Sequence, residues 1–222
     1  LEGAYLGDGR MKTLLREDSI LPRSLDSMGL SVLNEVHDAQ FIGEKTVTRA
    51  FPSDAVDWLL LELSSVSRVT PPDSLRFFLP VLLKRNGAIY SPSLQPAVAL
   101  ELPELLENGG RFIATLHHRN HLPVQWRDTL EVAPQRRFVL DWSDTSRVVG
   151  GALALRQFGS ADAEKPVFMM RAGDVSDEQH ERWSITRFDY DAAMSSAWRS
   201  ILREGYLRHD VDLDGLITTR DL

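Results

Sequence analysis

The sequence contains no cysteine among its 222 residues. Thiolate catalysis, disulfide bridges and zinc sites built on sulfur are therefore excluded, although the compartment is not fixed by this absence. Long hydrophobic runs are also missing. The run Trp58–Leu61 is far shorter than the roughly 20 apolar residues that a membrane-spanning helix needs. We therefore expect no membrane insertion.

Positive charge is in short supply as well. The 25 Lys and Arg residues are outnumbered by 32 Asp and Glu residues, which gives a net charge of −7. No basic cluster with interleaved aromatic residues is present to attract a phosphate backbone, so nucleic acid is not an expected partner. Hydrophobic residues make up 43% of the chain, enough for a normal globular core. Because the chain begins at Leu1 without a signal-like segment, we expect a processed product or a piece of a longer protein.

Short apolar or alternating runs separated by turn residues extend from Leu1 to about Asp144 and are typical of an all-β sandwich. The run Val56–Leu63 predicts a central strand covered on both faces, with a helix as the alternative. Asn86 and Gly87 predict a β-hairpin. The expected strands are Leu1–Leu6, Leu30–Val36, Thr46–Phe51, Val56–Leu63, Phe77–Leu83, Ala97–Leu102, Arg111–His118, Thr129–Val132 and Arg137–Trp142.

Glycine and charged residues are frequent between Arg147 and Lys165, which predicts a domain boundary. We expect a β-sandwich domain over residues 1–146, a linker or final strand over 147–165 and a smaller module over 166–222. Within this module, Asp191–Glu204 carries apolar residues at helical spacing. Asp191 is placed to cap the first turn of an amphipathic helix, and Gly205 to close the last.

The most specific motif begins at Asp210 and reproduces the ligand spacing of an EF-hand-type calcium loop. Oxygen-bearing side chains fall at loop positions 1, 3, 5, 9 and 12, and Gly215 at position 6 permits the sharp turn. The expected calcium ligands are Asp210, Asp212, Asp214, the carbonyl of Leu216, Thr218 and Asp221. Because carboxylates this close repel one another without a cation, we expect metal binding to be coupled to folding of this tail. The alternative is an acidic surface turn that binds no ion.

A second, irregular copy of the loop lies upstream. Its candidate ligands are Asp174, Ser176, Glu178, Thr186 and Asp189. About four extra residues, including His180, separate its two halves, and no glycine occupies the turn that the pattern requires. An ion site and a calcium-free structural loop both remain open interpretations of this segment.

The main loop has Asp221 at position 12, where the EF-hand pattern has Glu. Asp at this place is characteristic of dockerin-type calcium loops. This loop and several other segments make the chain resemble a known region of large surface proteins that bacteria export by type IX secretion. That region is a C-terminal β-sandwich followed by a dockerin-like calcium-binding module. The matching segments are Leu1–Tyr5, Gly9–Met11, Leu21–Pro22, Ala55–Leu63, Arg85–Gly87, Gly110–Leu122, Ala172–Asp174, Gly205–Leu207 and Asp210–Gly215. In that family the first loop is usually regular, so the segment Asp174–Asp189 departs from it.

The resemblance implies a mainly β chain with a small α module: an Ig-like antiparallel β-sandwich followed by a dockerin-like loop-helix module. The second helix of that module would begin at Leu222 and be truncated. The implied role is that of a non-catalytic, calcium-stabilised structural or adhesive accessory module, secreted or at the cell surface. Its partners would be other domains of the same parent protein, or a surface protein or glycan. The alternative is a recognition module that binds carbohydrate through the sandwich or a cohesin-like protein through the tail.

Three of the six histidines, His117, His118 and His121, lie within five residues. Imidazoles this close can ligate zinc or copper. On a strand, however, His117 and His118 point to opposite faces, so we favour a hydrogen-bonded strand end or turn. None of the usual nucleophile-elbow, phosphate-loop, dinucleotide or zinc-protease motifs is present. We therefore expect a protein that is not an enzyme.

Overall fold

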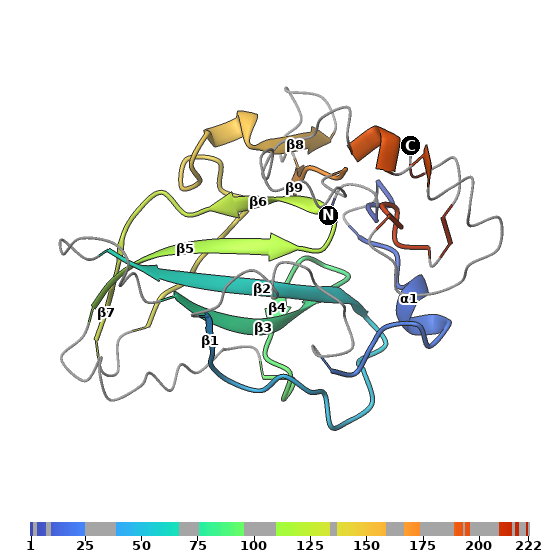
Figure 1. The fold of residues 1–222 in the computed structure, drawn as a ribbon, viewed down its shortest axis with the longest axis horizontal. Coiled ribbons are helices and arrows are strands. Elements are labelled where there is room, and N and C mark those ends of the chain that lie inside the picture. Colours follow the sequence, from blue (N-terminus) through green and yellow to red (C-terminus); the bar gives the residue numbers. More distant parts are fainter. Residues whose placement is uncertain are drawn as a thin grey trace.

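The structure, a computed structural model, describes residues 1, 4–7, 10–24, 39–66, 76–95, 110–133, 137–158, 167–173, 189–192, 194–195, 209–214, 216–217 and 221. These residues form a mainly β fold, as expected, with short helical segments at its edges (Figure 1). The elements are α1 (Leu14–Glu17), β1 (Ala39–Phe41), β2 (Ala55–Ser65), β3 (Arg76–Lys84), β4 (Ile89–Tyr90), β5 (Gly110–His118), β6 (His121–Gln125), β7 (Leu130–Val132), the 3-10 turn η3 (Gly151–Leu153), β8 (Leu155–Phe158) and β9 (Val167–Met170).

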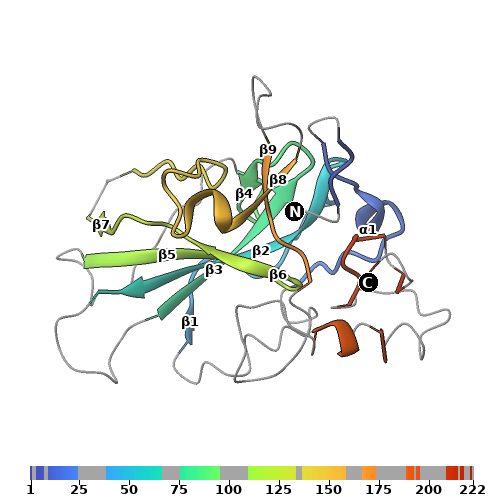
Figure 2. The same cartoon turned by 90° about the horizontal axis from the view of Figure 1, so that it is seen from above.

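Seven strands of the described part form one sheet in the order β1-β3-β2-β5-β6, with β4 paired to β3 and β7 paired to β5. All neighbours are antiparallel except β1 and β3, which run parallel. β8 and β9 form a separate antiparallel pair beside β6 (Figures 1 and 2). A single bridge between His121 and Ala172 joins β6 to the segment that follows β9. No helix in the described ranges has the length and apolar character needed to cross a bilayer.

β2 is the central strand, between β3 and β5. Leu60 pairs with Pro80 on one side and with His117 on the other. Its successive residues Trp58 and Leu59 point to opposite faces, and both are buried. The prediction of a central strand covered on both faces is therefore confirmed, and the helix alternative is wrong.

The strands predicted around β2, β3, β5 and β7 are confirmed. So is the hairpin, in which Gly87 adopts a φ of +85° between β3 and β4; only glycine takes this conformation without strain. The predicted strands Leu30–Val36 and Ala97–Leu102 lie outside the described residues.

Three predicted strands are wrong: Leu1–Leu6, Thr46–Phe51 and Arg137–Trp142. Where these are described, only the isolated bridges Tyr5–Met11 and Ser24–Thr46 occur. Phe138 and Leu140 pack against the core without joining a strand ladder. Alternating apolar and polar residues indicate that one side of a segment is buried. A loop that lies on a core shows this pattern as well as a strand does.

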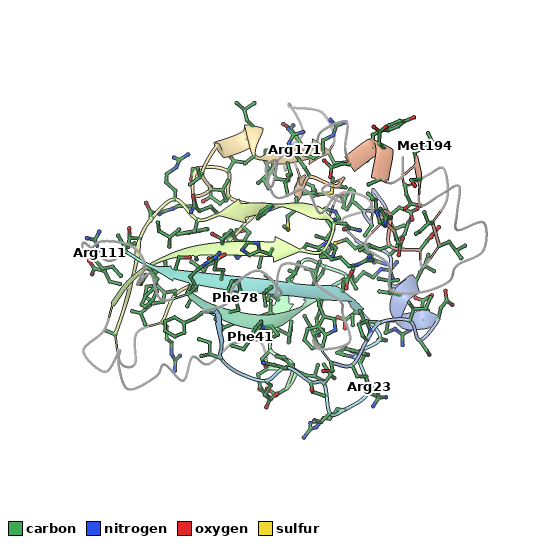
Figure 3. The ribbon with its side chains drawn as sticks, viewed as in Figure 1. Arg23, Phe41, Phe78, Arg111, Arg171 and Met194 are labelled. Carbon is green, nitrogen blue, oxygen red and sulfur yellow. The ribbon has the colours of Figure 1, made fainter. Side chains whose placement is uncertain are left out.

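The described side chains form two buried clusters. The smaller one includes Phe77, Phe112 and Trp126, and Trp142 packs edge-on against Trp126. The larger one spans the sheet and the N-terminal segment, with Phe41 at its border against Phe78 (Figure 3). Its members also include Leu213, from near the C-terminus.

The C-terminal segment lies beside α1 in both views (Figures 1 and 2). Leu213 is almost fully buried in the same cluster as Leu1, Ala4 and Leu15. The two ends of the chain therefore share one hydrophobic core.

The segments on either side of the predicted domain boundary pair with each other. β8 lies within the predicted linker, and β9 lies within the predicted module, yet they form one antiparallel ladder from Leu155–Met170 to Phe158–Val167. The division into domains stays a prediction.

The helix expected to begin at Asp191 begins earlier, because the chain is already helical at Asp189. The expected N-cap role of Asp191 is therefore wrong. Helix ends are fixed by local capping contacts that spacing alone does not determine.

Candidate metal centre

The acidic loop, defined here as residues 209–214, 216–217 and Asp221, brings three carboxylates together. One carboxylate oxygen from each of Asp210, Asp212 and Asp214 lies within 4.8 Å of the other two. Ligands of one calcium ion sit about 2.3–2.6 Å from it, so two of them are at most about 5 Å apart. The three carboxylates are thus close enough to hold a single metal ion.

The loop is wrapped by hydrogen bonds from its own backbone. Asp214 N–H donates to Asp210 Oδ1 at 3.0 Å, and Leu216 N–H donates to Asp214 Oδ1 at 2.9 Å. Asp221 Oδ1 accepts the N–H groups of Val211 at 2.8 Å and Asp212 at 3.3 Å. Asp221 therefore reaches back to the start of the loop, as the last position of a calcium loop must.

Asp212 has two carboxylate oxygens with different surroundings. Lys12 Nζ donates to Oδ2 at 2.7 Å. Oδ1 is buried and has no hydrogen-bond partner in the described part of the chain, and Asp212 as a whole is only 9% exposed. A buried carboxylate oxygen without a partner costs free energy that a cation would recover. An all-oxygen donor set with one such oxygen fits a hard divalent cation such as calcium.

The acidic loop is fastened to the turn between β5 and β6. Asn120 Nδ2 donates to the backbone oxygen of Asp210 at 2.6 Å. Arg119 Nη2 lies 3.4 Å from Asp210 Oδ2. All three residues are buried, so this contact is shielded from solvent and screened little by salt. The first residue of the loop is thereby held against the end of the sheet.

Arg119 also links the loop to Asp57 on β2. Arg119 Nε lies 3.2 Å from Asp57 Oδ2, and His118 Nε2 lies 3.1 Å from the same oxygen. The second oxygen, Asp57 Oδ1, accepts the backbone N–H of Trp58 at 2.7 Å. Asp57 is fully buried, and these donors offset the cost of burying its charge.

The hydrogen bonds of the turn define the tautomers of His118 and His121. Because the Nδ2 of Asn120 donates to the loop, its Oδ1 accepts, and His121 Nδ1 must donate to it at 2.7 Å. His118 donates its Nε2–H to Asp57, so its Nδ1, 2.9 Å from His121 Nδ1, is an acceptor and shares the single Nδ1–H of His121 with Asn120 Oδ1. Burial lowers the pKa of both imidazoles, that of His121 the more strongly, so both rings are neutral.

His117 belongs to a different cluster on β2, β3 and β5. Its Nε2 lies 2.7 Å from Glu62 Oε2, while Glu62 Oε1 accepts from Arg76 Nε at 2.6 Å and Ser64 Oγ at 2.5 Å. Burial by itself raises the pKa of Glu62, but these three donors outweigh it and lower the pKa to about 2. Glu62 is therefore ionised at neutral pH. His117 and His118 thus serve two separate carboxylates rather than one shared site, as opposite-face placement predicts.

The structure places only part of the predicted site. The carboxylates of Asp210, Asp212 and Asp214 come together. Asp221 contacts the loop through the backbone N–H groups of Val211 and Asp212, and the side chain of Leu216 is partly exposed, as a residue offering only its carbonyl can be. Thr218 lies outside the described residues, as do four residues of the upstream copy: Asp174, Ser176, Glu178 and Thr186. The fifth residue of that copy, Asp189, is buried.

Sequence reasoning missed Lys12, Asp57 and Arg119 as supports of the site. A signal existed for Asp57, because it is the first charged residue within the apolar run of β2 and a buried charge needs a partner.

Comparison of the chain with protein-family models, curated proteins and solved structures finds no match. The function is therefore inferred from the chemistry of the acidic loop and its supports.

Proposed function

We propose that this chain is a calcium-stabilised, non-catalytic accessory module of a secreted or cell-surface bacterial protein, with a structural or adhesive role. The observation that carries the proposal is the acidic loop, in which three carboxylates converge and Asp212 Oδ1 is buried without a partner. The proposed ligands are Asp210, Asp212, Asp214, the carbonyl of Leu216, Thr218 and Asp221. In this proposal the sheet belongs to a β-sandwich, and the loop belongs to a dockerin-like module.

Calcium suits the loop better than magnesium does. Calcium accepts six to eight oxygen ligands in a flexible shell, whereas magnesium demands a near-octahedral set and keeps several waters. The proposed ligands combine four carboxylates, a hydroxyl and a carbonyl within one short stretch of chain. This crowded and partly buried oxygen set favours the larger ion.

The stabilising effect would reach beyond the tail. Leu213 packs in the larger core, and Asp210 contacts Arg119 and Asn120 at the end of the sheet. An ion that binds only the folded loop stabilises everything that unfolds with it, by mass action. We therefore expect calcium to raise the stability of the sheet as well.

The proposed partners are neighbouring domains of the same parent protein, or a surface protein or glycan.

Thermal unfolding tests the proposal. Calcium a hundredfold above its Kd is expected to stabilise the protein by about 2.7 kcal/mol, which raises the Tm by roughly 5–10 °C for a chain of this size. Magnesium should raise it much less. The double variant Asp210→Asn/Asp214→Asn should lose the calcium response. The matched control Asp128→Asn/Asp144→Asn, which removes two exposed carboxylates elsewhere, should keep it.

Two results would count against the calcium site. One is a calcium-induced rise in Tm of the same size in the Asp210/Asp214 double variant as in the wild type. The other is an equal response to magnesium and calcium. Measurement in excess EDTA supplies the metal-free baseline for each protein.

The recognition alternative finds less support in the described residues. Carbohydrate platforms present exposed aromatic side chains, but Trp58 and Trp126 are buried, and Trp142 packs edge-on against Trp126. Phe158 and Tyr190 are about half exposed, and Phe158 packs edge-on against Tyr5. Trp183 and Trp198 lie outside the described residues. We therefore keep the structural or adhesive role as the proposal.

A further inference from the structure

A lysine from the opposite end of the chain lies against the acidic loop. Lys12 Nζ is 2.7 Å from Asp212 Oδ2 and 3.2 Å from the backbone oxygen of Asp212, across a separation of 200 residues. Within the described part of the chain, both hydrogen bonds of the ammonium group go to this one residue. The third position of the proposed calcium loop therefore already has a cation of the protein's own beside it.

Lys12 differs from Arg119, which also contacts the loop. Arg119 is almost wholly buried, and it is shared between Asp210 and Asp57. The Lys12 side chain is 21% exposed, whereas that of Arg119 is 2% exposed. A flexible, strongly hydrated ammonium group can shift or leave at much lower cost than a buried guanidinium held by two carboxylates.

We propose that Lys12 is a resident counter-cation of the acidic loop, which keeps the metal-free loop folded and lowers its affinity for calcium. The inference rests on the proposed calcium site. Without metal, the ammonium group reduces the repulsion among Asp210, Asp212 and Asp214. With metal, the same charge lies a few ångströms from a divalent ion and opposes its binding. Asp212 Oδ1, which Lys12 leaves without a partner, is the oxygen that remains for the ion.

This arrangement has a consequence for where the loop would bind calcium. A loop weakened by an internal cation belongs with the extracellular calcium modules, whose Kd values lie at about 10⁻⁴–10⁻³ M. In this proposal the loop folds and docks on the sheet without calcium, which replaces the expectation that metal binding is coupled to folding of the tail. The loop would then bind calcium only where the calcium concentration is high. The lysine thus sets the calcium concentration at which the proposed stabilisation begins.

Calorimetric calcium titration of the whole chain tests this role with two charge-removing variants. Lys12→Met removes both the charge and the hydrogen bonds, and Lys12→Gln removes the charge but keeps a donor for Asp212. Both should bind calcium roughly tenfold more tightly, equivalent to about 1.4 kcal/mol. Both should also melt at a lower temperature than the wild type in EDTA, and this deficit should shrink in saturating calcium.

Two further variants serve as controls. Lys12→Arg retains the charge and should stay within about threefold of the wild-type affinity, a difference of roughly 0.7 kcal/mol. Lys84→Met is the matched control, because Lys84 pairs with Asp54 at 3.3 Å and its side chain is 18% exposed. It should leave the calcium affinity unchanged.

The outcomes separate this inference from the proposed function. If the wild type binds calcium and both neutral variants bind it equally or more weakly, the role of Lys12 is refuted and the calcium site stands. If only the neutral variants bind calcium, Lys12 is the cation of the loop and the proposed calcium function of the wild type is refuted. If none of the proteins binds calcium, both proposals are refuted.

Discussion

Two adjacent histidines on β5 reach two different buried carboxylates on β2. His117 contacts Glu62, and His118 contacts Asp57. Glu62 and Asp57 are five positions apart on the strand, so they project from opposite faces of the sheet. The two pairs look alike in isolation, but their remaining partners differ.

The remaining partners of Glu62 lie within the sheet, because Arg76 is on β3 and Ser64 is on β2. The network of Asp57 extends through Arg119 to Asp210 in the acidic loop. A buried charge must be paired when the structure forms. The Glu62 cluster is thus complete once β2, β3 and β5 have assembled. The Asp57 network is complete only when the C-terminal loop has docked, which makes it the link between the sheet and the proposed calcium site.

The largest difference between the two clusters is expected when each buried carboxylate is replaced by its amide. Asp57→Asn should destabilise the fold by about 3–5 kcal/mol, because it removes one charge of a buried network and leaves Arg119 without that counter-charge. It should also weaken calcium binding, since Arg119 is then drawn more strongly to Asp210. Glu62→Gln should leave the calcium affinity unchanged. Urea unfolding and calcium titration of both variants make the comparison.

Equal effects of the two substitutions on calcium affinity would break the distinction between the clusters. Asp128→Asn is the matched reference for removal of an aspartate, because Asp128 forms an exposed ion pair with Arg147. Its expected cost is at most about 1 kcal/mol.

A smaller expected effect is that the two clusters change the stability of the fold in different pH ranges. The pKa of Glu62 is lowered from 4.5 to about 2 in the folded protein, so the unfolded chain binds the proton first. Its stabilising contribution is present in full above pH 4.5 and is lost as the pH falls towards 2. Glu62→Gln should remove this dependence while leaving stability changes above pH 5 as they are.

The Asp57 network should respond in a higher pH range. The pKa values of His118 and His121 are lowered from 6.5 by burial, so the unfolded chain takes up protons first as the pH falls below 6.5. Stability should therefore decline from pH 6.5 downwards. His121→Asn, which can keep a donor to Asn120, should reduce that decline and leave the Glu62 range intact. Chemical unfolding at pH steps from 7.5 to 2.5 measures both. A single transition that neither variant alters would contradict the account.

The sheet was largely predictable from the sequence, for identifiable reasons. β2, β3 and β5 carry apolar runs of strand length, and the Asn86–Gly87 turn has the residue types that a tight hairpin requires. The run Arg137–Trp142 has the same alternation but packs as a loop. Sequence alternation records burial, whereas strand pairing depends on a partner that the pattern does not name.

The site was predictable only in its local part. The spacing of Asp210, Asp212 and Asp214 is a short-range pattern, and these residues do converge. Their supports are 90 or more residues away in the chain: Asn120 and Arg119 on one side and Lys12 on the other. No periodicity connects such distant positions, and only the folded chain shows that Lys12 and Arg119 contact the loop.

A crystal structure of the calcium-soaked protein, with the anomalous signal of the ion, would show whether the acidic loop binds calcium while docked on the sheet. We expect one calcium ion about 2.3–2.6 Å from oxygens of Asp210, Asp212 and Asp214, with Arg119 still between Asp57 and Asp210. An ion bound away from these carboxylates, or an acidic loop that has left Arg119 and the sheet, would contradict this expectation.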